Sequence, residues 1–187
     1  MRVSHYTLRR GLFIGRFQPL HLGHLATIKF ASESVEQLTI VVGSADKSHE
    51  MRNPFTAGER IEMIKDTLDN DNEINIKNIL IIPVPDIGVH ALWTKQIELL
   101  IPRFEIVFSN DPLTNILFRE RGIKLIEPRL YKRELLSSTE IRSRIVKGKN
   151  WKKLVTPETL EVIQDVDGIR RIKTVSAGKA DTSHVLS

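Results

Sequence analysis

The feature that constrains the fold most is a junction near the start of the chain, where an apolar run at residues 11–14 meets a turn. Gly15 ends the run, and the residues beyond the turn, about 24–35, show the apolar spacing of an amphipathic helix. This order predicts a buried first strand, a tight turn and a first helix. Open α/β sheets bind phosphate at such a junction, because a helix N-terminus offers free N–H groups and the positive end of a dipole.

The side chains at this turn suit an anionic ligand. His21 and His24 lie three residues apart, so they fall on one face of the first helical turn and could reach the same anion. Arg16 stands just before the turn and could close over that anion with its planar fork of donors. A lone histidine near a helix start is more often exposed or capping. The pair in this frame therefore points to a function more strongly than either residue would.

Apolar, β-branched runs predict further strands at residues 37–42, 79–84, 104–108 and 123–126. Helical patterns with capping signals lie between and after them, at residues 56–68, 91–100, 112–121, from 137 onward, and 157–166. Strands that alternate with helical crossovers predict a mostly parallel sheet. The expected fold is therefore α/β, a Rossmann-like doubly wound sheet with C-terminal helices.

The connecting segments are less informative. Residues 44–54 are polar and turn-rich, and we expect them to form a loop over the site. Residues 69–78 predict a second loop with no evident function. Gly168 is expected to stop the helix before it, and residues 169–175 are expected to form a last helical turn or a strand.

Composition sets the outer limits. With 187 residues and 41% hydrophobic content, the chain can bury one sizeable core, and we expect one domain over residues 1–175 and a mobile tail over 176–187. The absence of cysteine excludes disulfides, cysteine zinc sites and thiol nucleophiles. The polar N-terminus and the lack of a long apolar stretch predict a soluble, cytoplasmic protein without a membrane segment.

The net charge of +5 is compatible with nucleic acid or with small anionic ligands. The 28 basic residues are mixed with 23 acidic ones rather than gathered into a tract, which favours small anions. Charge alone does not choose between the two partners.

Residues 15–24, Gly-Arg-Phe-Gln-Pro-Leu-His-Leu-Gly-His, resemble the histidine-containing signature of the nucleotidylyltransferase superfamily. This version is most similar to archaeal-type nicotinamide-mononucleotide (NMN) adenylyltransferases. Residues 53–60, Asn-Pro-Phe-Thr-Ala-Gly-Glu-Arg, are similar to a second stretch of that family. Residues 137–142, Ser-Ser-Thr-Glu-Ile-Arg, resemble the second superfamily signature. The resemblance extends over about residues 11–172.

The resemblance implies transfer of the adenylyl group of ATP to NMN, with NAD and pyrophosphate as products. It implies contacts with the reacting phosphates for His21, His24, Arg16 and Arg142. It implies ATP and phosphate binding by Gly15, Phe17, Gln18, Arg52, Ser109, Asp111, Ser137, Ser138 and Thr139. It implies NMN binding by Ser44, Asp86, Ile87, His90 and Trp93, although the family has asparagine where this chain has His90.

Several of these residues also have purely structural explanations. Asp111, followed by a proline, suits a helix N-cap, and Ser137 opens a capping box. A single tryptophan such as Trp93 is more often a core residue. Arg52 on its own would be a solvated surface charge, whereas Arg60, inside a helix, is equally well explained as a structural ion-pair partner.

The motifs contain no Ser-His-Asp set, no paired carboxylates and no metal-ligand triad. Adenylyl transfer needs none of these, because the 5′-phosphate of NMN is already a nucleophile and pyrophosphate leaves well once its charge is met. Catalysis is then expected to consist of positioning and electrostatic stabilisation. Mg²⁺ is expected to enter with ATP, with no metal held by protein ligands.

The expected partners are ATP, NMN and NAD, with no nucleic acid and no membrane, and the resemblance implies a homo-oligomer, specifically a hexamer. Two alternatives stay open. Another nucleotidylyltransferase, with a different phosphorylated acceptor, would keep both phosphate motifs and change only the pocket between Asp86 and Trp93. A basic nucleic-acid-binding module would need a basic face and aromatic platforms.

Overall fold

The computed structural model describes residues 9–128 and 135–178. Its centre is a five-stranded sheet in which every neighbouring pair of strands is parallel, with the order β3-β2-β1-β4-β5. The strands are β1 (Arg10–Gly15), β2 (Gln37–Val42), β3 (Ile79–Pro83), β4 (Ile106–Phe108) and β5 (Lys124–Ile126). The chain runs outward from β1 to β3 and then returns to the other side of β1. The strand order therefore reverses between β1 and β4, and open α/β sheets bind ligands at the carboxyl ends of such a pair.

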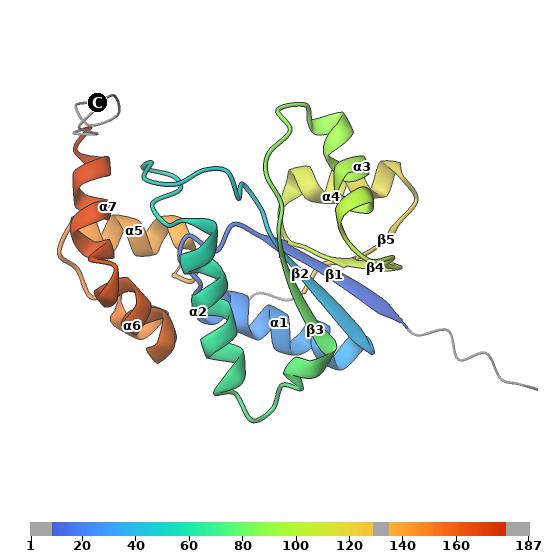
Figure 1. The fold of residues 1–187 in the computed structure, drawn as a ribbon, viewed down its shortest axis with the longest axis horizontal. Helices are drawn as coiled ribbons and strands as arrows, with labels where there is room; N and C mark the ends of the chain where they lie inside the picture. Colours follow the sequence, from blue (N-terminus) through green and yellow to red (C-terminus); the bar gives the residue numbers. More distant parts are fainter. Residues whose placement is uncertain (1–8, 129–134, 179–187) are drawn as a thin grey trace, which may run out of the picture.

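Helices cover both faces of the sheet (Figure 1). The α-helices are α1 (Leu22–Ser34), α2 (Ala57–Asp69), α3 (His90–Leu100), α4 (Pro112–Glu120), α5 (Ser138–Val146), α6 (Pro157–Asp165) and α7 (Gly168–Ser176). Two short 3-10 helices, η1 (Ile76–Asn78) and η2 (Lys152–Leu154), lie in connections. α1, α2 and the C-terminal helices lie on one side and α3 and α4 on the other, so the predicted doubly wound α/β fold is confirmed.

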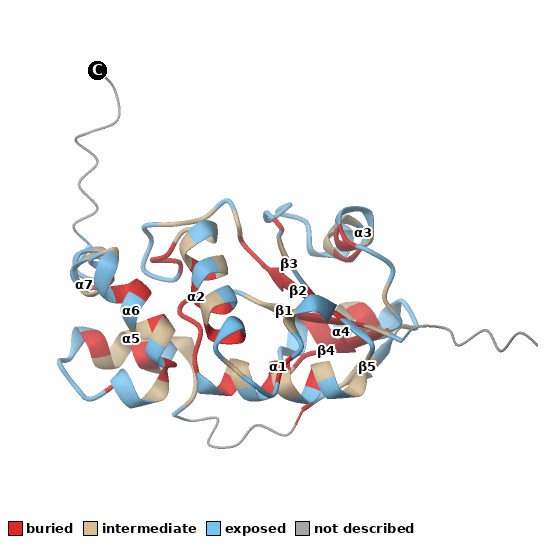
Figure 2. Ribbon diagram, turned by 60° about the horizontal axis from the view of Figure 1, so that its bottom comes forward, coloured by how far each residue is buried: buried red, intermediate tan, exposed pale blue. Residues whose placement is uncertain are grey.

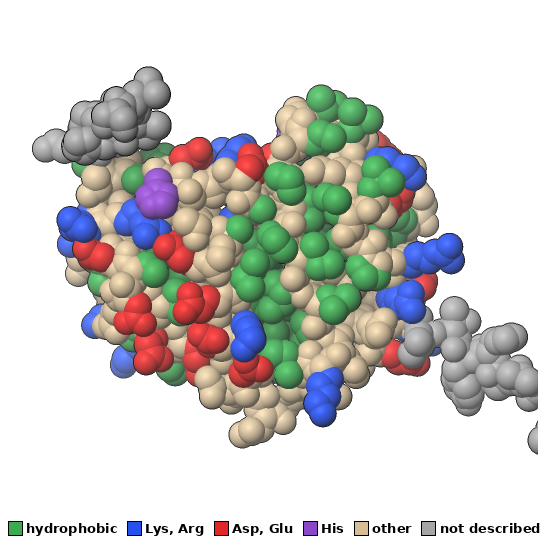
Figure 3. All heavy atoms as spheres, viewed as in Figure 1, with side chains coloured by type: hydrophobic (Ala, Val, Ile, Leu, Met, Phe, Trp, Pro, Cys, Tyr) green, Lys and Arg blue, Asp and Glu red, His purple; other side chains and the backbone are tan. Residues whose placement is uncertain are grey.

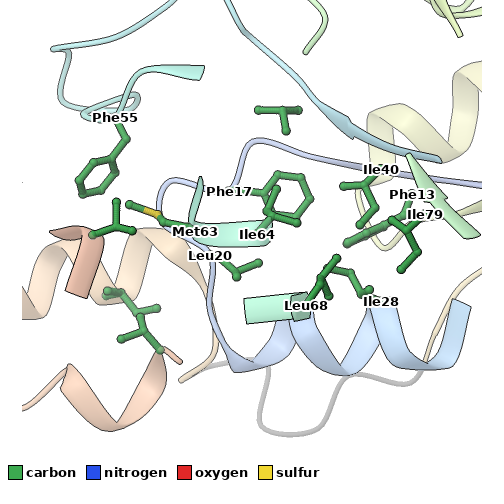
Figure 4. Close-up of a cluster of buried hydrophobic side chains, with 14 of the residues drawn as sticks. Phe13, Phe17, Leu20, Ile28, Ile40, Phe55, Met63, Ile64, Leu68 and Ile79 are labelled. Atoms are coloured by element: carbon green, nitrogen blue, oxygen red, sulfur yellow. The ribbon is translucent and has the colours of Figure 1, made fainter. Parts of the chain in front are cut away.

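Alternation along the strands divides the buried side chains into two clusters. Phe13 and Ile40 face α1 and α2, in the larger cluster that also includes residues of the C-terminal helices (Figure 4). Leu12 and Val41, their neighbours in sequence, face the opposite way, into a smaller cluster with Ile97 of α3 and residues of α4. Figure 2 shows the result, in which the central strands are buried between helices that expose their outer faces. Burial on both faces explains why these strands are continuously apolar.

The predicted helix starts are confirmed with their capping interactions. Thr56 and Glu59 form the reciprocal capping box of α2, and the Asp111 side chain accepts from the N–H of Thr114 at the start of α4. Ser137 caps α5 by accepting from the N–H of residue 140. The box expected there is incomplete, because the carboxylate of Glu140 bonds Arg144 Nε at 2.7 Å.

The structure differs from the sequence prediction at the end of α6. Gly168 does not stop this helix; it begins α7, and the left-handed residue between the two helices is Asp167, with φ 51°. Glycine is needed at 168 because a Cβ there would lie 2.7 Å from the ring of Phe55. Residues 169–175 are helical, which decides between the two predicted alternatives, and most of the predicted tail, residues 179–187, lies outside the described residues.

Two of the predicted connections are also refined. β4 is shorter than expected, since it begins at Ile106, and the predicted loop at 69–78 ends in the 3-10 turn η1. Within the part of the chain that the structure describes, no helix is long and apolar enough to cross a membrane. The single domain over residues 1–175 stays a prediction.

Helix α7 is fastened to the segment that leads into α2. Arg171 Nη1 donates to both carboxylate oxygens of Glu59, at 2.9 and 2.6 Å, and to the carbonyl of Pro54 at 3.3 Å. The two side chains are only 18% and 14% exposed. Glu59 also accepts from the N–H of Thr56, so one carboxylate serves both the ion pair and the capping box. The C-terminal helix thereby backs the segment that follows the loop over the site.

Removal of this ion pair should destabilise the fold. We expect Arg171→Met to lower the free energy of unfolding by about 2 kcal/mol, because it leaves a largely buried carboxylate without its cation. The adjacent Arg170 is a matched control: it pairs with Asp167 but is 81% exposed, so Arg170→Met should change stability by less than about 0.5 kcal/mol. Urea unfolding of both variants measures this difference, and equal effects would contradict it.

Candidate active site

A cavity of about 800 Å³ lies at the carboxyl edge of the sheet, where β1 and β4 end. Its walls come from the turns after β1 and β4, the loops after β2 and β3, and the start of α5. Every residue to which the sequence assigned a role lines this one cavity: Gly15, Arg16, Phe17, Gln18, His21, His24, Ser44, Arg52, Asp86, Ile87, His90, Trp93, Ser109, Asp111, Ser137, Ser138, Thr139 and Arg142. The tertiary structure therefore brings these residues together, and their individual roles stay predictions.

The two histidines form a stacked pair at the start of α1. Their ring centroids are 3.7 Å apart and the rings are inclined by 22°. His21 is the N-cap of the helix, and its Nδ1 accepts from the backbone N–H of His24 at 3.2 Å. Because Nδ1 is an acceptor, the neutral ring of His21 carries its proton on Nε2 and can donate from there. Gly23 leaves room for this arrangement, since a Cβ at that position would lie 3.0 Å from Nδ1 of His21.

Burial keeps both rings neutral. It lowers the pKa of His21 from 6.5 to about 4. It also lowers the pKa of His24 well below its ordinary value, with a further contribution from the neighbouring His21. At neutral pH the pair therefore offers hydrogen-bond donors rather than positive charge. Nδ1 of His24 is buried and has no hydrogen-bond partner among the described residues.

Gly15 makes room for a neighbouring aromatic ring. The resemblance implies ATP and phosphate binding by this glycine, and that role stays a prediction. In the structure a Cβ on Gly15 would lie 2.8 Å from the ring of Phe17, so the glycine makes room for that ring. Phe17 is fully buried with φ 50°, and its ring lies 4.7 Å from the ring of His24. The glycine thus allows an aromatic support for the histidine pair.

The Gln18 side chain has structural partners, and the ATP and phosphate binding that the resemblance implies for this residue stays a prediction. Its side-chain amide donates to the carbonyl of Phe55 and accepts from the N–H of the same residue, both at 2.9 Å. The side chain is 1% exposed. These two bonds tie the turn after β1 to the segment that precedes α2, so Gln18 fixes the shape of the site.

Within residues 9–128 and 135–178, Arg60 does not form the ion pair considered from the sequence. Its guanidinium is fully buried and donates to main-chain carbonyls: to Arg16 at 2.9 Å, to Gly43 at 2.7 Å and to Ser44 at 3.1 Å, with Nε donating to Thr56 at 3.0 Å. Burial, and next the charge of Arg16, lowers the pKa of Arg60 to about 10, which leaves it charged at neutral pH. It ties the ends of β1 and β2 to α2.

The start of α5 is joined to the turn after β1 by two hydrogen bonds. Ser138 Oγ donates to the carbonyl of Pro19 at 3.0 Å, and Arg142 Nη1 donates to the carbonyl of Gln18 at 2.7 Å. These partners lie 119 and 124 residues apart in sequence. The two signature motifs therefore form one wall of the cavity.

Three arginines converge at this wall. Burial lowers the pKa of Arg142 to about 10, and the charges of Arg16 and Arg52 contribute to the shift. Arg16 and Arg52 are exposed, and neither guanidinium has a hydrogen bond or ion pair among the described residues. Cations that repel one another in this way favour a polyanionic ligand between them.

The opposite end of the cavity is built on Asp86. Its carboxylate accepts from Lys47 Nζ at 2.8 Å and from Ser44 Oγ at 3.1 Å. Burial alone would raise the pKa of Asp86, but these hydrogen bonds and the charge of Lys47 hold it below its ordinary value. His90 is exposed at the start of α3, and Trp93 is partly buried with its ring centroid 6.0 Å from that of Phe118.

The turn after β4 uses both of its predicted residues structurally. Ser109 is buried and its Oγ accepts from the N–H of Asp111 at 3.0 Å, while the Asp111 carboxylate accepts from the N–H and hydroxyl of Thr114. Lining residues that sequence reasoning missed include Lys47, Glu50 and Asn53. They lie in the loop that the sequence predicted over the site, and this position was the signal that could have identified them.

Comparison with known proteins agrees with this geometry. The cytidylyltransferase-like family matches residues 12–144. A nicotinamide-nucleotide adenylyltransferase of Pyrococcus furiosus is 41% identical over 169 residues, covering 90% of each chain. One from Methanolobus tindarius is 44% identical over 174 residues, covering 93% of this chain and 98% of its own. The chain belongs to the nicotinamide-nucleotide adenylyltransferase family.

A solved structure supports the same fold. The bifunctional NMN adenylyltransferase/ADP ribose pyrophosphatase of Francisella tularensis, complexed with AMP and a manganese ion, superimposes with a TM-score of 0.72 at 22% identity. The match covers 91% of this chain and 53% of that protein, so the chain spans about half of its length. Among residues 9–128 and 135–178, no cluster of three or more histidine, aspartate or glutamate side chains could hold a metal ion.

The lowered pKa of His21 predicts a pH-dependent stability. Between pH 4 and 6.5 the unfolded state binds a proton that the folded state does not, so the free energy of unfolding should rise with pH across this window by about 3 kcal/mol. Below pH 4 both states are protonated and above pH 6.5 neither is.

His21→Asn removes this titration and keeps a good N-cap side chain. Urea unfolding of the wild type and the variant at several pH values measures the effect. We expect acidification to lower the free energy of unfolding of the wild type by about 3 kcal/mol more than that of the variant. Parallel profiles would show that burial of His21 carries no such proton linkage.

Proposed function

We propose that the protein transfers the adenylyl group of ATP to NMN, giving NAD and pyrophosphate. The observation that carries this proposal is the convergence of two helix N-termini, three arginines and two neutral histidines on one cavity, in a chain of this family. An oxygen of the NMN 5′-phosphate attacks the α-phosphorus of ATP, and the bond between that phosphorus and the oxygen bridging to the β-phosphate breaks. Pyrophosphate leaves with the electron pair.

The phosphate end of the cavity supplies the charge that this reaction needs. Arg16, Arg52 and Arg142 hold the β- and γ-phosphates, together with the free N–H groups at the start of α5. His21 and His24 donate hydrogen bonds near the α-phosphate, where negative charge grows in the transition state. Because contacts within the protein hold the two histidines and Arg142 in place, these donors need little reorganisation during the reaction.

The other end receives the acceptor nucleotide. Asp86, ionised and oriented by Lys47 and Ser44, is placed to accept hydrogen bonds from ribose hydroxyls. Trp93 offers an aromatic surface for the pyridine ring, with Ile87 and His90 beside it on the lining of the cavity. If the protein were a nucleotidylyltransferase with another phosphorylated acceptor, that acceptor would bind against these same residues. The choice of acceptor is therefore the part of the proposal to test.

A divalent cation, expected to be Mg²⁺, would enter as the complex with ATP. Octahedral Mg²⁺ that is bound through substrate phosphates and water needs few protein ligands, so the donor set of the cavity fits this mode. Its contribution would be to offset the charge of the triphosphate, while the arginines of this chain orient the outer phosphates.

The test is pyrophosphate release and NAD formation from ATP, Mg²⁺ and NMN, compared with other phosphorylated acceptors. His24→Ala should lower kcat/KM by about 100- to 1,000-fold, by analogy with the loss of an oxyanion donor. His49→Ala is a matched control, because His49 is an exposed histidine in the loop after β2 that does not line the cavity. Full activity of a folded His24→Ala protein would contradict the role of the pair, and release with another acceptor only would contradict the choice of NMN.

We also propose that the protein assembles into a homo-oligomer, a hexamer by family resemblance. Large hydrophobic side chains are exposed on the edge strand β3 and on α3, and Figure 3 shows hydrophobic atoms gathered over these elements. They include Leu80, Leu92, Leu99 and Leu100, each 48% to 74% exposed. Such a surface favours burial against another copy.

Light scattering tests this assembly. We expect a particle mass of several times the 21.4 kDa of one chain, and a lower mass for Leu99→Lys because a charge in the contact must be desolvated. A single-chain mass across the whole concentration range would contradict the oligomer.

A further inference from the structure

The acceptor end of the cavity carries an excess of negative charge on two facing loops. Lys47 and Glu50 line the cavity from the loop after β2, and Asp86 lines it from the loop after β3. Asp46 joins the two loops, since its Oδ1 accepts from the N–H of Asp86 at 2.8 Å. Lys47 is paired with Asp86 and also feels the charges of Asp46 and Glu50. One cation is thus set among three carboxylates.

Asp86, the partner of Lys47, lies on the loop that precedes the helix of Trp93. The loop that carries Asp86 leads directly into α3, and Gln96 Nε2 of that helix donates to the carbonyl of Pro85 at 3.1 Å. Trp93 lies on the same helix and lines the cavity. Arg16, which belongs to the phosphate end, and the buried Arg60 also interact electrostatically with Asp86.

Two acceptors differ in charge only at the ring. NMN carries a neutral carboxamide, whereas its deamidated form, nicotinic acid mononucleotide, carries a carboxylate at the same position. The ribose and the 5′-phosphate are common to both. The arginines at the phosphate end affect the rates with both acceptors in the same way, so their effect largely cancels in the ratio of the two rates. That ratio therefore reports mainly on charges near the ring.

We propose that the charges of the loop after β2 set the selectivity between these two acceptors. Asp46 and Glu50 disfavour the additional carboxylate, and Lys47 weakens that discrimination by supplying a compensating cation beside Asp86. This inference rests on the proposed function, because it assumes that the pyridine nucleotide binds beside Asp86. Lys47 and Glu50 thus determine specificity and do not contact the reacting phosphates, which bind at the phosphate end of the cavity.

The experiment measures kcat/KM for both acceptors in the full-length protein at low ionic strength. Lys47→Met should raise the preference for NMN over the deamidated nucleotide by about three- to tenfold, as expected for a unit charge several ångströms away near a protein surface. Glu50→Gln should change the same ratio in the opposite direction. Lys65→Met is a matched control, because Lys65 also pairs with a carboxylate, Asp69, but does not line the cavity. High salt should reduce both shifts.

An increase of the NMN preference in one variant and a decrease in the other would support the proposal. Loss of structure would lower the rates with both acceptors and would not move the preference in opposite directions. An unchanged ratio, or a change in the same direction in both variants, would overturn it while the proposed function stands. Failure of the wild type to adenylylate either acceptor would overturn the proposed function and this inference with it.

Discussion

The buried guanidinium of Arg60 is the interaction on which the site depends. A cation without a carboxylate partner in the interior is costly, and here the carbonyls of Arg16, Gly43 and Ser44 compensate for the lost hydration. Those carbonyls belong to the ends of β1 and β2, so one side chain from α2 sets the distance between the two strand ends and the helix. The same strand ends carry residues of both halves of the cavity.

Further buried contacts extend this framework to the reacting groups. Gln18 ties the turn after β1 to Phe55, and Arg171 holds the carboxylate that caps α2. Ser138 and Arg142 dock the start of α5 onto the same turn. The result is a rigid base of hydrogen bonds beneath exposed, mutually repelling arginines. Such a base suits electrostatic catalysis, because donors that are already in place need not reorganise as charge develops.

Local physical chemistry explains what was predictable. The strand at 37–42 was exact, and the caps of Thr56 and Asp111 were found, because strand burial and helix capping depend on residues close in sequence. The error at Gly168 lies where a distant ring decides the need for glycine. Gly168 accommodates the ring of Phe55, which lies far away in sequence, and no local pattern contains this contact. Lys47 was missed for the same reason, since its partner Asp86 lies on another loop.

The sequence by itself determined the alternation of strands and helices, the position of the turn after the first strand and part of the residues that line the cavity, because periodicity, capping and motifs are properties of the chain. Only the tertiary structure decided how these residues are used. Burial keeps the histidines neutral, and the side chains of Gln18 and Arg60 form hydrogen bonds with main-chain groups. Lys47 lies among carboxylates and pairs with Asp86. Desolvation and long-range hydrogen bonds arise from packing between segments far apart in sequence, so they exist only once the chain has folded.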